Sequence, residues 1–386
     1  MQVERLGLED FRNYLRVAVE FAPGLNLVVG RNAQGKTNLL EAVHCLSGLG
    51  SPRSPDAALV REGCERSLLH ADIKKGERQL RLDLEIRPGR GTKALINGTP
   101  LHGTRPLSEV LVTVFFGPDE LSLVKGSPDG RRRFLDDLVV KLHPSRVTLR
   151  REWERVLKQR NALLRSAPRR GAGSLGQTLE VWNEALCRTG AGLAGARLEA
   201  LGRLLPYARK RYEEVAGGGD LEVNYASEWL DGYIIDSALS SPAAIDDSIL
   251  RQQLTSKLEE VREREFERGI SLAGPQRDDI AIRLASPGAA AGQLEARNHA
   301  SQGEQRTSAL ALKLAEHDLL SDALGYHPIL LLDDVFSELD SSRRGWLAGA
   351  VGAMGQTLLS SAEPVPPGSV KFERILEVSS GEVTVR

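Results

Sequence analysis

One stretch of the sequence has the residue types and spacing of a loop that binds phosphate. Residues 30–37 read G-R-N-A-Q-G-K-T, which fits G-x-x-x-x-G-K-[ST], and they follow an apolar run and precede an apolar helical stretch. The glycines let successive backbone N–H groups turn toward one anion, and the helix adds the positive end of its dipole. We therefore predict a site for the phosphates of a nucleoside triphosphate. Its expected residues are Gly30, Arg31, Asn32, Ala33, Gln34, Gly35, Lys36, Thr37 and Asn38.

A second stretch supplies the acidic groups that such a site needs. Residues 329–332 are apolar and are followed by Asp333 and Asp334, which places two carboxylates at the carboxyl end of a buried strand. In the expected site Lys36 reaches the β- and γ-phosphates, and Thr37 and Asp333 bind Mg²⁺. Asp334 is the expected catalytic base that orients and deprotonates the attacking water. Taken alone, the acidic pair could equally cap a helix or form a turn.

A third motif begins another helix. Residues 301–306 read S-Q-G-E-Q-R, so Ser301 and Gly303 lie at a helix N-terminus that could bind an anion. Ser301 and Glu304 also fit a capping box, and both functions can coexist. A single ATP does not need two such loops from one chain. We therefore expect this loop to close over the nucleotide of a second copy.

Composition limits the classes of protein. The chain has 386 residues, 41% of them hydrophobic and 27% charged, with a net charge of −1, so it can form two or three domain-sized units. Any surface for nucleic acid must be local. Three scattered cysteines indicate a reducing compartment, and the sequence shows neither a signal pattern nor an apolar run of membrane-spanning length. We expect a cytoplasmic protein without a membrane partner.

The pattern of apolar residues predicts an α/β fold that is interrupted by a helical insertion. Strands are expected in residues 1–117 and again from about residue 274, with helices between them. One long helix is expected over 179–215, with a possible break at Pro206, and small-residue loops are expected at 166–176 and 286–293. Because Lys36 and Asp333 must meet, residues 1–117 and 271–386 are expected to form one head with a mixed central sheet. Residues 118–270 are then an inserted helical arm.

A basic segment lies within that arm. Residues 121–170 hold 14 basic and five acidic residues, a net charge of +9. This charge suits the phosphate backbone of duplex DNA, although an ordinary solvated helical face would look the same. The candidate DNA-binding residues are Arg131, Arg132 and Arg133. Ion pairs between this triplet and Asp136 or Asp137 are the structural alternative.

The order of the motifs resembles the ABC-type ATPase head, and more closely the bacterial RecF family of DNA replication and repair proteins. The matching blocks span nearly the whole chain, and the blocks at 121–136 and 274–280 are not general ABC features. They are GLEDFRNY (7–14), GRNAQGKTNLLEA (30–42), LSLVKGSPDGRRRFLD (121–136), GPQRDDI (274–280), SQGEQR (301–306) and LLLDDVFSELD (330–340).

The resemblance implies a site that two protomers share. ATP would bind the phosphate loop of one protomer and the motif formed by Ser301, Gly303 and Gln305 of the other, with 337–340 as an interprotomer loop. The resemblance further implies an ATP-dependent homodimer on duplex and gapped DNA, at boundaries between single and double strands. It also implies work with RecO and RecR to load RecA in recombination and the SOS response, with slow, DNA-dependent ATP hydrolysis.

The sequence departs from the ABC pattern in two places. The histidine that commonly contacts the γ-phosphate is missing, since the last histidine is His327, and Ser360 or Ser361 is the expected substitute. The usual metal-contacting glutamine is also missing, and Asp119 or Glu120 is expected to replace it. These changes favour a slow enzyme in which ATP mainly controls dimerisation.

Two other classes share the phosphate loop. An ABC transporter subunit is disfavoured because 265 positions separate Lys36 from Ser301, and such an insertion is foreign to compact transporter heads. A structural SMC-like bridging protein would need a far longer coiled coil than the short leucine stripe at 250–261.

Overall fold

The computed structural model describes residues 1–166, 176–241, 245–285, 294–362 and 371–386. The loop expected at 286–293 and residues 167–175 of the loop expected at 166–176 lie outside these ranges. The chain divides into two compact units, and each is described here by itself. Unit 1 consists of residues 1–122, 210–219 and 300–386, and unit 2 of residues 123–209 and 220–299. No helix in these ranges is long and apolar enough to cross a membrane.

Unit 1 contains the mixed central sheet that the sequence predicts. Its inner strands are parallel and almost entirely buried, which explains their continuous apolar sequences. Only the edge strand β15 runs antiparallel, against β14. In spatial order the strands are β15 (Glu382–Val385), β14 (Arg374–Ser379), β3 (Leu25–Val29), β13 (Thr357–Ser361), β12 (Ile329–Leu332) and β8 (Thr113–Phe116).

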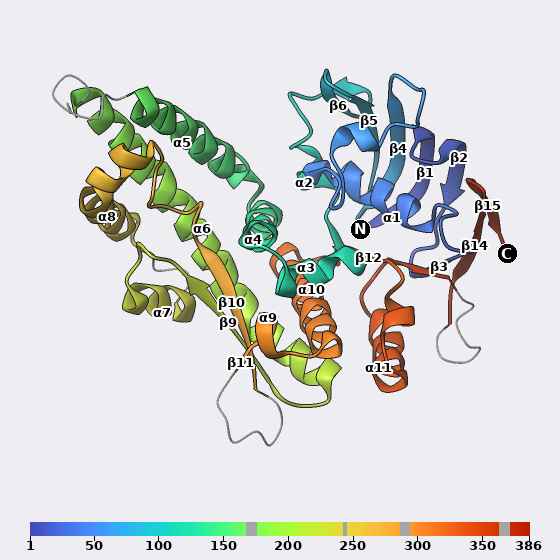
Figure 1. Cartoon of the computed structure of the whole chain (residues 1–386). Helices are drawn as coiled ribbons and strands as arrows, with labels where there is room; N and C mark the ends of the chain where they lie inside the picture. The colour runs from blue at the N-terminus through green and yellow to red at the C-terminus, as the bar shows by residue number, and fades with distance from the viewer. Residues whose placement is uncertain (167–175, 242–244, 286–293, 363–370) are drawn as a thin grey trace. The chain divides into compact units, whose positions relative to one another are not determined.

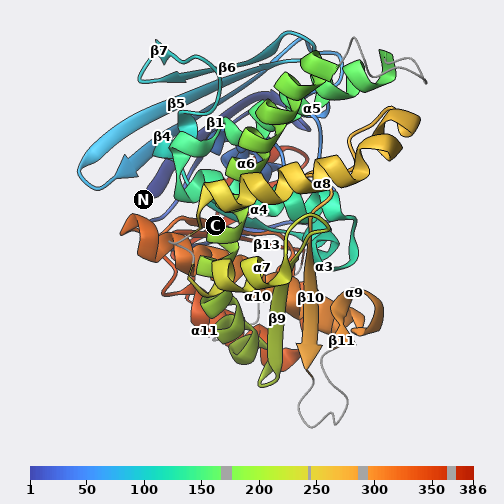
Figure 2. The ribbon, with the colours of Figure 1, turned by 90° about the vertical axis from the view of Figure 1, so that its left-hand side faces the viewer.

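A second, antiparallel sheet of unit 1 comes from the first hundred residues. Alternating burial along its long strands leaves one face in the core and one in solvent. Asn97 and Gly98 both have positive φ in the turn between its last two strands, as an Asn-Gly hairpin requires. Figure 2 shows β4 and β5 as the long strands of this sheet. The order is β2 (Tyr14–Glu20), β1 (Gln2–Phe11), β4 (Ser67–Lys75), β5 (Arg78–Arg87), β6 (Gly91–Ile96) and β7 (Thr99–Pro100).

The main core of unit 1 lies around helix α1 (Lys36–His44). Leu39, Leu40 and Val43 of α1 are fully buried in one cluster with residues of both sheets, including Val28 and Leu69. This packing fixes the helix that begins at Lys36. The other helices of unit 1 are α2 (Leu107–Val110), α10 (Gln302–Leu324) and α11 (Ser341–Val351) (Figure 1).

Unit 2 is mostly helical, with one three-stranded antiparallel sheet. The 41-residue helix α6 is its longest element, although its last residues belong to unit 1. The helices are α3 (Ser122–Lys125), α4 (Pro128–Leu142), α5 (Leu149–Ser166), α6 (Gly176–Ala216), α7 (Gly232–Ser240), α8 (Asp247–Arg268) and α9 (Ala296–His299). The strands are β11 (Leu294–Glu295), β10 (Asp279–Ala285) and β9 (Asp220–Ala226).

The unit boundaries differ from the expected insertion at 118–270. Residues 271–299 cluster with unit 2 because β10 pairs with β9, Ile282 lying opposite Val223. Strand β9 itself lies in a segment that we expected to be helical. Residues 210–219 cluster with unit 1, and α6 passes Pro206 without the break that the sequence suggested.

Candidate functional site

The phosphate loop joins β3 to α1 and is supported by the turn between β1 and β2. Gly35 has φ 119°, and a Cβ there would lie 2.6 Å from Asn13 Nδ2 and 2.9 Å from the Tyr14 hydroxyl. Tyr14 donates a hydrogen bond of 3.0 Å to the Gly35 carbonyl, and Asn13 donates one of 2.8 Å to the Gln34 carbonyl. Only glycine combines this backbone conformation with such close neighbours. The turn therefore fixes the carbonyls of the loop.

A buried carboxylate anchors α1 to the same turn. Glu41 of α1 accepts hydrogen bonds from Arg12 Nε at 3.0 Å and Nη2 at 2.8 Å, and from Ser51 Oγ at 2.6 Å. Burial opposes ionisation of Glu41, but these hydrogen bonds and the charge of Arg53 outweigh it and lower its pKa. The charged network keeps the start of α1 next to the β1–β2 turn.

Lys36 lies folded over the loop. Its Nζ donates to the carbonyls of Gly30 at 2.8 Å and Arg31 at 3.0 Å. Burial lowers the pKa of Lys36, while the nearby carboxylates of Asp334 and Asp333 oppose that shift. The ammonium group therefore lies inside the loop and close to both acidic residues, where it can bind a phosphate oxygen.

Thr37 and Asp333 meet across 296 positions of sequence. Thr37 Oγ1 lies 2.7 Å from Asp333 Oδ2 and 2.9 Å from Oδ1, and Ser360 Oγ donates to Oδ1 at 2.6 Å. Burial raises the pKa of Asp333, although the hydroxyls of Ser360 and Thr37 favour its charged form. One hydroxyl of the first turn of α1 and one carboxylate directly after β12 thus face each other.

These donors suit a small divalent cation. Mg²⁺ prefers oxygen ligands and usually takes one or two carboxylates together with water and phosphate oxygens. Thr37 Oγ1 and Asp333 supply that chemistry beside Lys36, and the shared hydroxyl–carboxylate contact is one that a cation can replace. The residues present therefore fit the expected metal.

Asp334 occupies an unusual backbone position directly after β12. Its φ is 51°, in the left-handed region that aspartate tolerates better than most residues, and its N–H donates to Ser360 Oγ at 2.9 Å. Its Oδ1 is buried and has no hydrogen-bond partner among the described residues. A buried acceptor of this kind is suited to binding a water molecule.

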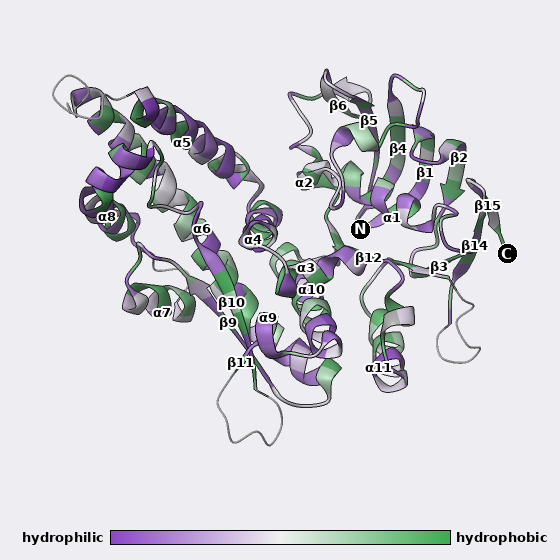
Figure 3. Cartoon of the chain, in the orientation of Figure 1, coloured by the Kyte–Doolittle hydropathy of each residue, from purple (hydrophilic) through white to green (hydrophobic). Residues whose placement is uncertain are grey.

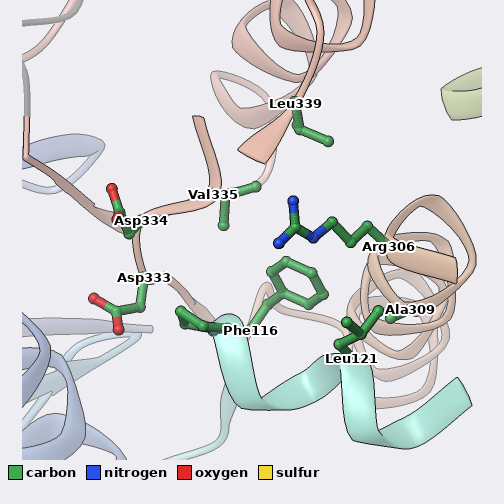
Figure 4. A pocket seen from close by; sticks show the side chains of 10 residues that line it. Phe116, Leu121, Arg306, Ala309, Asp333, Asp334, Val335 and Leu339 are labelled. Atoms are coloured by element: carbon green, nitrogen blue, oxygen red, sulfur yellow. The ribbon is translucent and has the colours of Figure 1, made fainter. Parts of the chain in front are cut away.

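A pocket opens in front of the two acidic residues. Figure 4 shows Asp333 and Asp334 on one side, Arg306 of α10 on the other, and the apolar side chains of Phe116 and Leu121 beneath them. The pocket combines charged groups with an apolar floor and lies wholly within unit 1.

The motif at 301–306 forms the start of α10. Ser301 Oγ accepts from the Glu304 N–H at 3.3 Å, and the Ser301 N–H donates to Glu304 Oε2 at 2.8 Å, which completes the predicted capping box. The cap starts the helix at Gln302, directly after Ser301. Ser301 and Gly303 are exposed, whereas Gln305 is buried and donates to the Ala300 carbonyl at 3.1 Å. The role of this motif in a second protomer stays a prediction.

The suggested substitutes for the missing ABC residues have other contacts. Ser360 is fully buried between Asp333 and Asp334, so it supports the carboxylates from behind. Glu120 lies 3.5 Å from Lys313 of α10. These contacts do not test whether Ser360 binds the γ-phosphate or Glu120 binds the metal, so both roles stay predictions.

The arginine triplet of α4 lies in unit 2 and is partly structural. Arg131 is 3% exposed and forms a two-pronged ion pair with Asp279, at 2.6 and 2.8 Å. Arg132 donates to the Asp278 carbonyl at 2.7 Å and to Asp129, and Arg133 is the one exposed member of the triplet. Burial of Arg131 corrects our expectation of a contact with DNA there. The alternative prediction, that the triplet forms ion pairs within the protein, was right, but it named Asp136 and Asp137 as the partners.

Residues 274–280 explain why the arginine triplet is partly buried. Asp278 is 1% exposed and accepts hydrogen bonds from the Tyr225 hydroxyl at 2.6 Å and from Trp229 Nε1 at 2.9 Å. Asp136 pairs with Arg197 at 2.7 Å instead of with the triplet. The two sequence blocks that set this chain apart from general ABC proteins therefore meet in one buried polar network.

Sequence reasoning missed the residues that brace the loop. Asn13, Tyr14 and Glu41 lie in the sequence blocks quoted above, but no local pattern assigns them a partner. A cluster of polar residues at a hairpin turn was the one available signal, since turns at the edge of a sheet often carry functional side chains.

Comparisons with known proteins agree with this geometry. Residues 2–363 match the family model of the RecF/RecN/SMC N terminal domain. The chain is 44% identical to the DNA replication and repair protein RecF of Streptomyces avermitilis, over 94% of both chains. It is 41% identical to that of Kineococcus radiotolerans, over 99% of this chain and 98% of the other.

Solved structures show the same fold. The recombination mediator protein RecF-ATP of the RecFOR pathway matches all of this chain and 97% of its own with a TM-score of 0.87 and 26% identity. An SMC head bound to the C-winged helix domain of ScpA matches with a TM-score of 0.57 at 15% identity, which shows a shared fold alone.

The fold and the site define an ABC-type ATPase head of the SMC-like class. With relatives matching almost end to end, the transporter alternative no longer holds. The chain belongs to the RecF family of DNA replication and repair proteins.

Proposed function

We propose that the chain is an ATP-controlled DNA-binding protein of recombinational repair, in which ATP joins two protomers. The observation that carries this proposal is the contact between Thr37 and Asp333, which joins the phosphate loop to the acidic strand in one buried site. The solved relative that contains ATP supports the choice of nucleotide.

The residues of the site have separate tasks in this proposal. Lys36 binds the β- and γ-phosphates, and Asp334 accepts a proton from a water that its buried Oδ1 orients. Thr37 and Asp333 hold Mg²⁺, which would offset the phosphate charge. Ser301 and Gly303, exposed at the start of α10, contact the γ-phosphate of the partner protomer.

The biological setting follows from family membership. The dimer binds duplex and gapped DNA at boundaries between single and double strands, and works with RecO and RecR to load RecA. Hydrolysis is slow and depends on DNA, so that ATP acts chiefly as a switch for dimerisation.

The test is dimerisation measured by analytical ultracentrifugation with ATP, on gapped DNA, duplex DNA and no DNA. We expect Lys36→Ala to abolish ATP binding, because its two contacts place the ammonium group at the phosphates. Ser301→Arg should retain ATP binding but prevent dimerisation, because the larger side chain fills the surface that faces the partner. Asp334→Asn should bind ATP and dimerise but hydrolyse slowly, since asparagine tolerates the left-handed backbone but cannot take a proton.

Three results would contradict the proposal. They are ATP-dependent dimerisation by Ser301→Arg, normal hydrolysis by Asp334→Asn, and dimer formation that is indifferent to DNA. Leu15→Ala, at an exposed position of β2, is the matched control and should behave as wild type.

A further inference from the structure

Helix α5 of unit 2 carries its charges on one face. Trp153, Arg160 and Leu164 form its buried side. Arg151, Arg155, Lys158, Ala162 and Arg165 are all exposed and follow each other in steps of four, three, four and three residues. Such steps keep side chains on one face of an α-helix, here opposite the buried side. We call these five residues the α5 stripe.

The cations of the α5 stripe have no acidic partners. Within the described part of the chain, none of its four basic side chains forms an ion pair. Of the two glutamates on α5, Glu154 binds Arg150 at 2.8 Å. The one other arginine in the middle of the helix, Arg160, is neutralised inside the unit by Glu265 at 2.6 Å. The stripe is therefore a surface of uncompensated positive charge.

Helix α8 of the same unit shows what a merely solvated face looks like. Its partly buried Lys257 pairs with Glu260 at 2.9 Å, and its exposed Arg251 pairs with Asp247. Acidic and basic residues alternate along it, as expected for solubility. The whole chain has a net charge of −1, so its surface is not generally basic. The cations of the α5 stripe are therefore a local concentration of positive charge. Figure 3 shows hydrophilic residues along much of α5.

We propose that the α5 stripe binds the phosphate backbone of duplex DNA. The inference rests on the proposed function and adds the surface that it uses. From Arg151 to Arg165 the stripe extends about 21 Å at about 1.5 Å per residue, which corresponds to about six base pairs. Ala162 in its middle leaves room for a backbone to approach closely. The stripe carries no aromatic side chain, and Trp153 of the same helix is buried, so stacking on single strands is not its chemistry.

The test compares two triple variants of the full chain with ATP bound. Arg151→Gln, Arg155→Gln and Lys158→Gln neutralise the stripe. Arg251→Gln, Arg264→Gln and Arg268→Gln remove the same charge from exposed positions of α8. Binding of a duplex is measured by fluorescence anisotropy over a range of salt concentrations, and thermal unfolding and ATP binding without DNA show that each variant is intact.

We expect the stripe variant to bind duplex more than about ten-fold more weakly at low salt, whatever the sequence. The slope of log K against log salt should fall by about three, roughly one for each lost phosphate contact. The α8 variant should bind as wild type does. An unchanged slope, equal weakening by the α8 variant, or a loss confined to single strands would each overturn the assignment. Failure of the wild type to bind any duplex would instead overturn the proposed function, and the assignment with it.

Discussion

Ser360 holds both acidic residues of the site through one hydroxyl. Its Oγ donates to Asp333 Oδ1 at 2.6 Å and accepts from the Asp334 N–H at 2.9 Å. It therefore holds the carboxylate of Asp333 and also the left-handed backbone of Asp334. We expect this serine to position the two acidic residues.

Replacing Ser360 tests this role. Ser360→Ala should leave the buried Asp333 carboxylate short of one hydrogen bond, at a cost of about 1–3 kcal/mol. We expect slower ATP hydrolysis with little change in ATP affinity, and Ser360→Thr should restore the rate because it keeps the hydroxyl. Steady-state ATPase assays with DNA and equilibrium ATP titrations measure the two effects. A weaker ATP affinity at an unchanged hydrolysis rate would show that the hydroxyl acts on the nucleotide instead.

At the scale of elements, the β1–β2 turn and the phosphate loop form one assembly. Asn13 donates to the Gln34 carbonyl at 2.8 Å and accepts from Asn38 Nδ2 at 2.7 Å. The loop conformation before nucleotide binds thus depends on residues that cannot reach the phosphates themselves.

Asn13→Ala should consequently weaken ATP binding by about five- to ten-fold, since each lost hydrogen bond is worth about 1 kcal/mol. Isothermal titration with ATP and Mg²⁺ measures the effect. Leu15→Ala, two positions along and 63% exposed, is the control. Equal affinities of the two variants would mean that the loop holds its shape without the turn.

Another assembly ties three helical segments of unit 2 together. Arg160 of α5 donates to Asn183 of α6 at 2.7 Å, to Glu265 of α8 at 2.6 Å and to Ser271 at 2.7 Å. Arg160→Met leaves Glu265 as a buried, unpaired charge. We expect a loss of about 3–5 kcal/mol in the free energy of unfolding, measured by urea denaturation.

Arg155→Met, at an exposed position of the same helix, should change that free energy by less than about 0.5 kcal/mol. Similar losses in the two variants would indicate that helix propensity or packing, and not the ion pair, controls stability.

The sequence predicts elements where the pattern is local. Strands β3 and β12 and the cap of α10 follow from apolar runs and a capping box. Strand β9 was missed although Leu221, Val223 and Tyr225 alternate, because its partner β10 lies more than 50 residues later. The burial of Arg131 was missed for the same reason, since its partner Asp279 lies 148 positions later. Long-range pairing decides both, and no local pattern reveals it.

At the scale of the whole molecule, the motifs predicted that the two chain ends meet. That prediction was confirmed by the contact between Thr37 and Asp333, but the units proved to exchange segments at 210–219 and 271–299. The last residues of α6 belong to unit 1 and β10 belongs to unit 2, so neither follows the boundaries expected at 118 and 270.

Stability as a function of pH should reflect the buried network of unit 2. Burial raises the pKa of Asp278 to about 6, above its ordinary value, although Tyr225 and Ser227 favour its charged form. The folded chain then binds a proton that the unfolded chain has released, so the contribution of this group is fully present at low pH and is lost as pH rises toward about 6.

Urea unfolding at a series of pH values checks this expectation. Asp278→Asn cannot titrate at this position. The free energy of unfolding of the wild type should therefore fall relative to that of the variant as pH rises from about 4 to about 6. A difference that is constant over this range would mean that Asp278 is ionised throughout.

The order of strands in the central sheet has a consequence for synthesis. Strand β3 pairs with β13 on one side and β14 on the other, and both are made more than 300 residues later. At roughly 5–20 residues per second, a ribosome needs about 15–65 seconds to supply them. During that time both edges of β3 lack their partners in the central sheet, although the β1–β2 turn is already present beside the phosphate loop. We therefore expect a nascent chain to need chaperones, and the complete nucleotide site to form only once translation has almost finished.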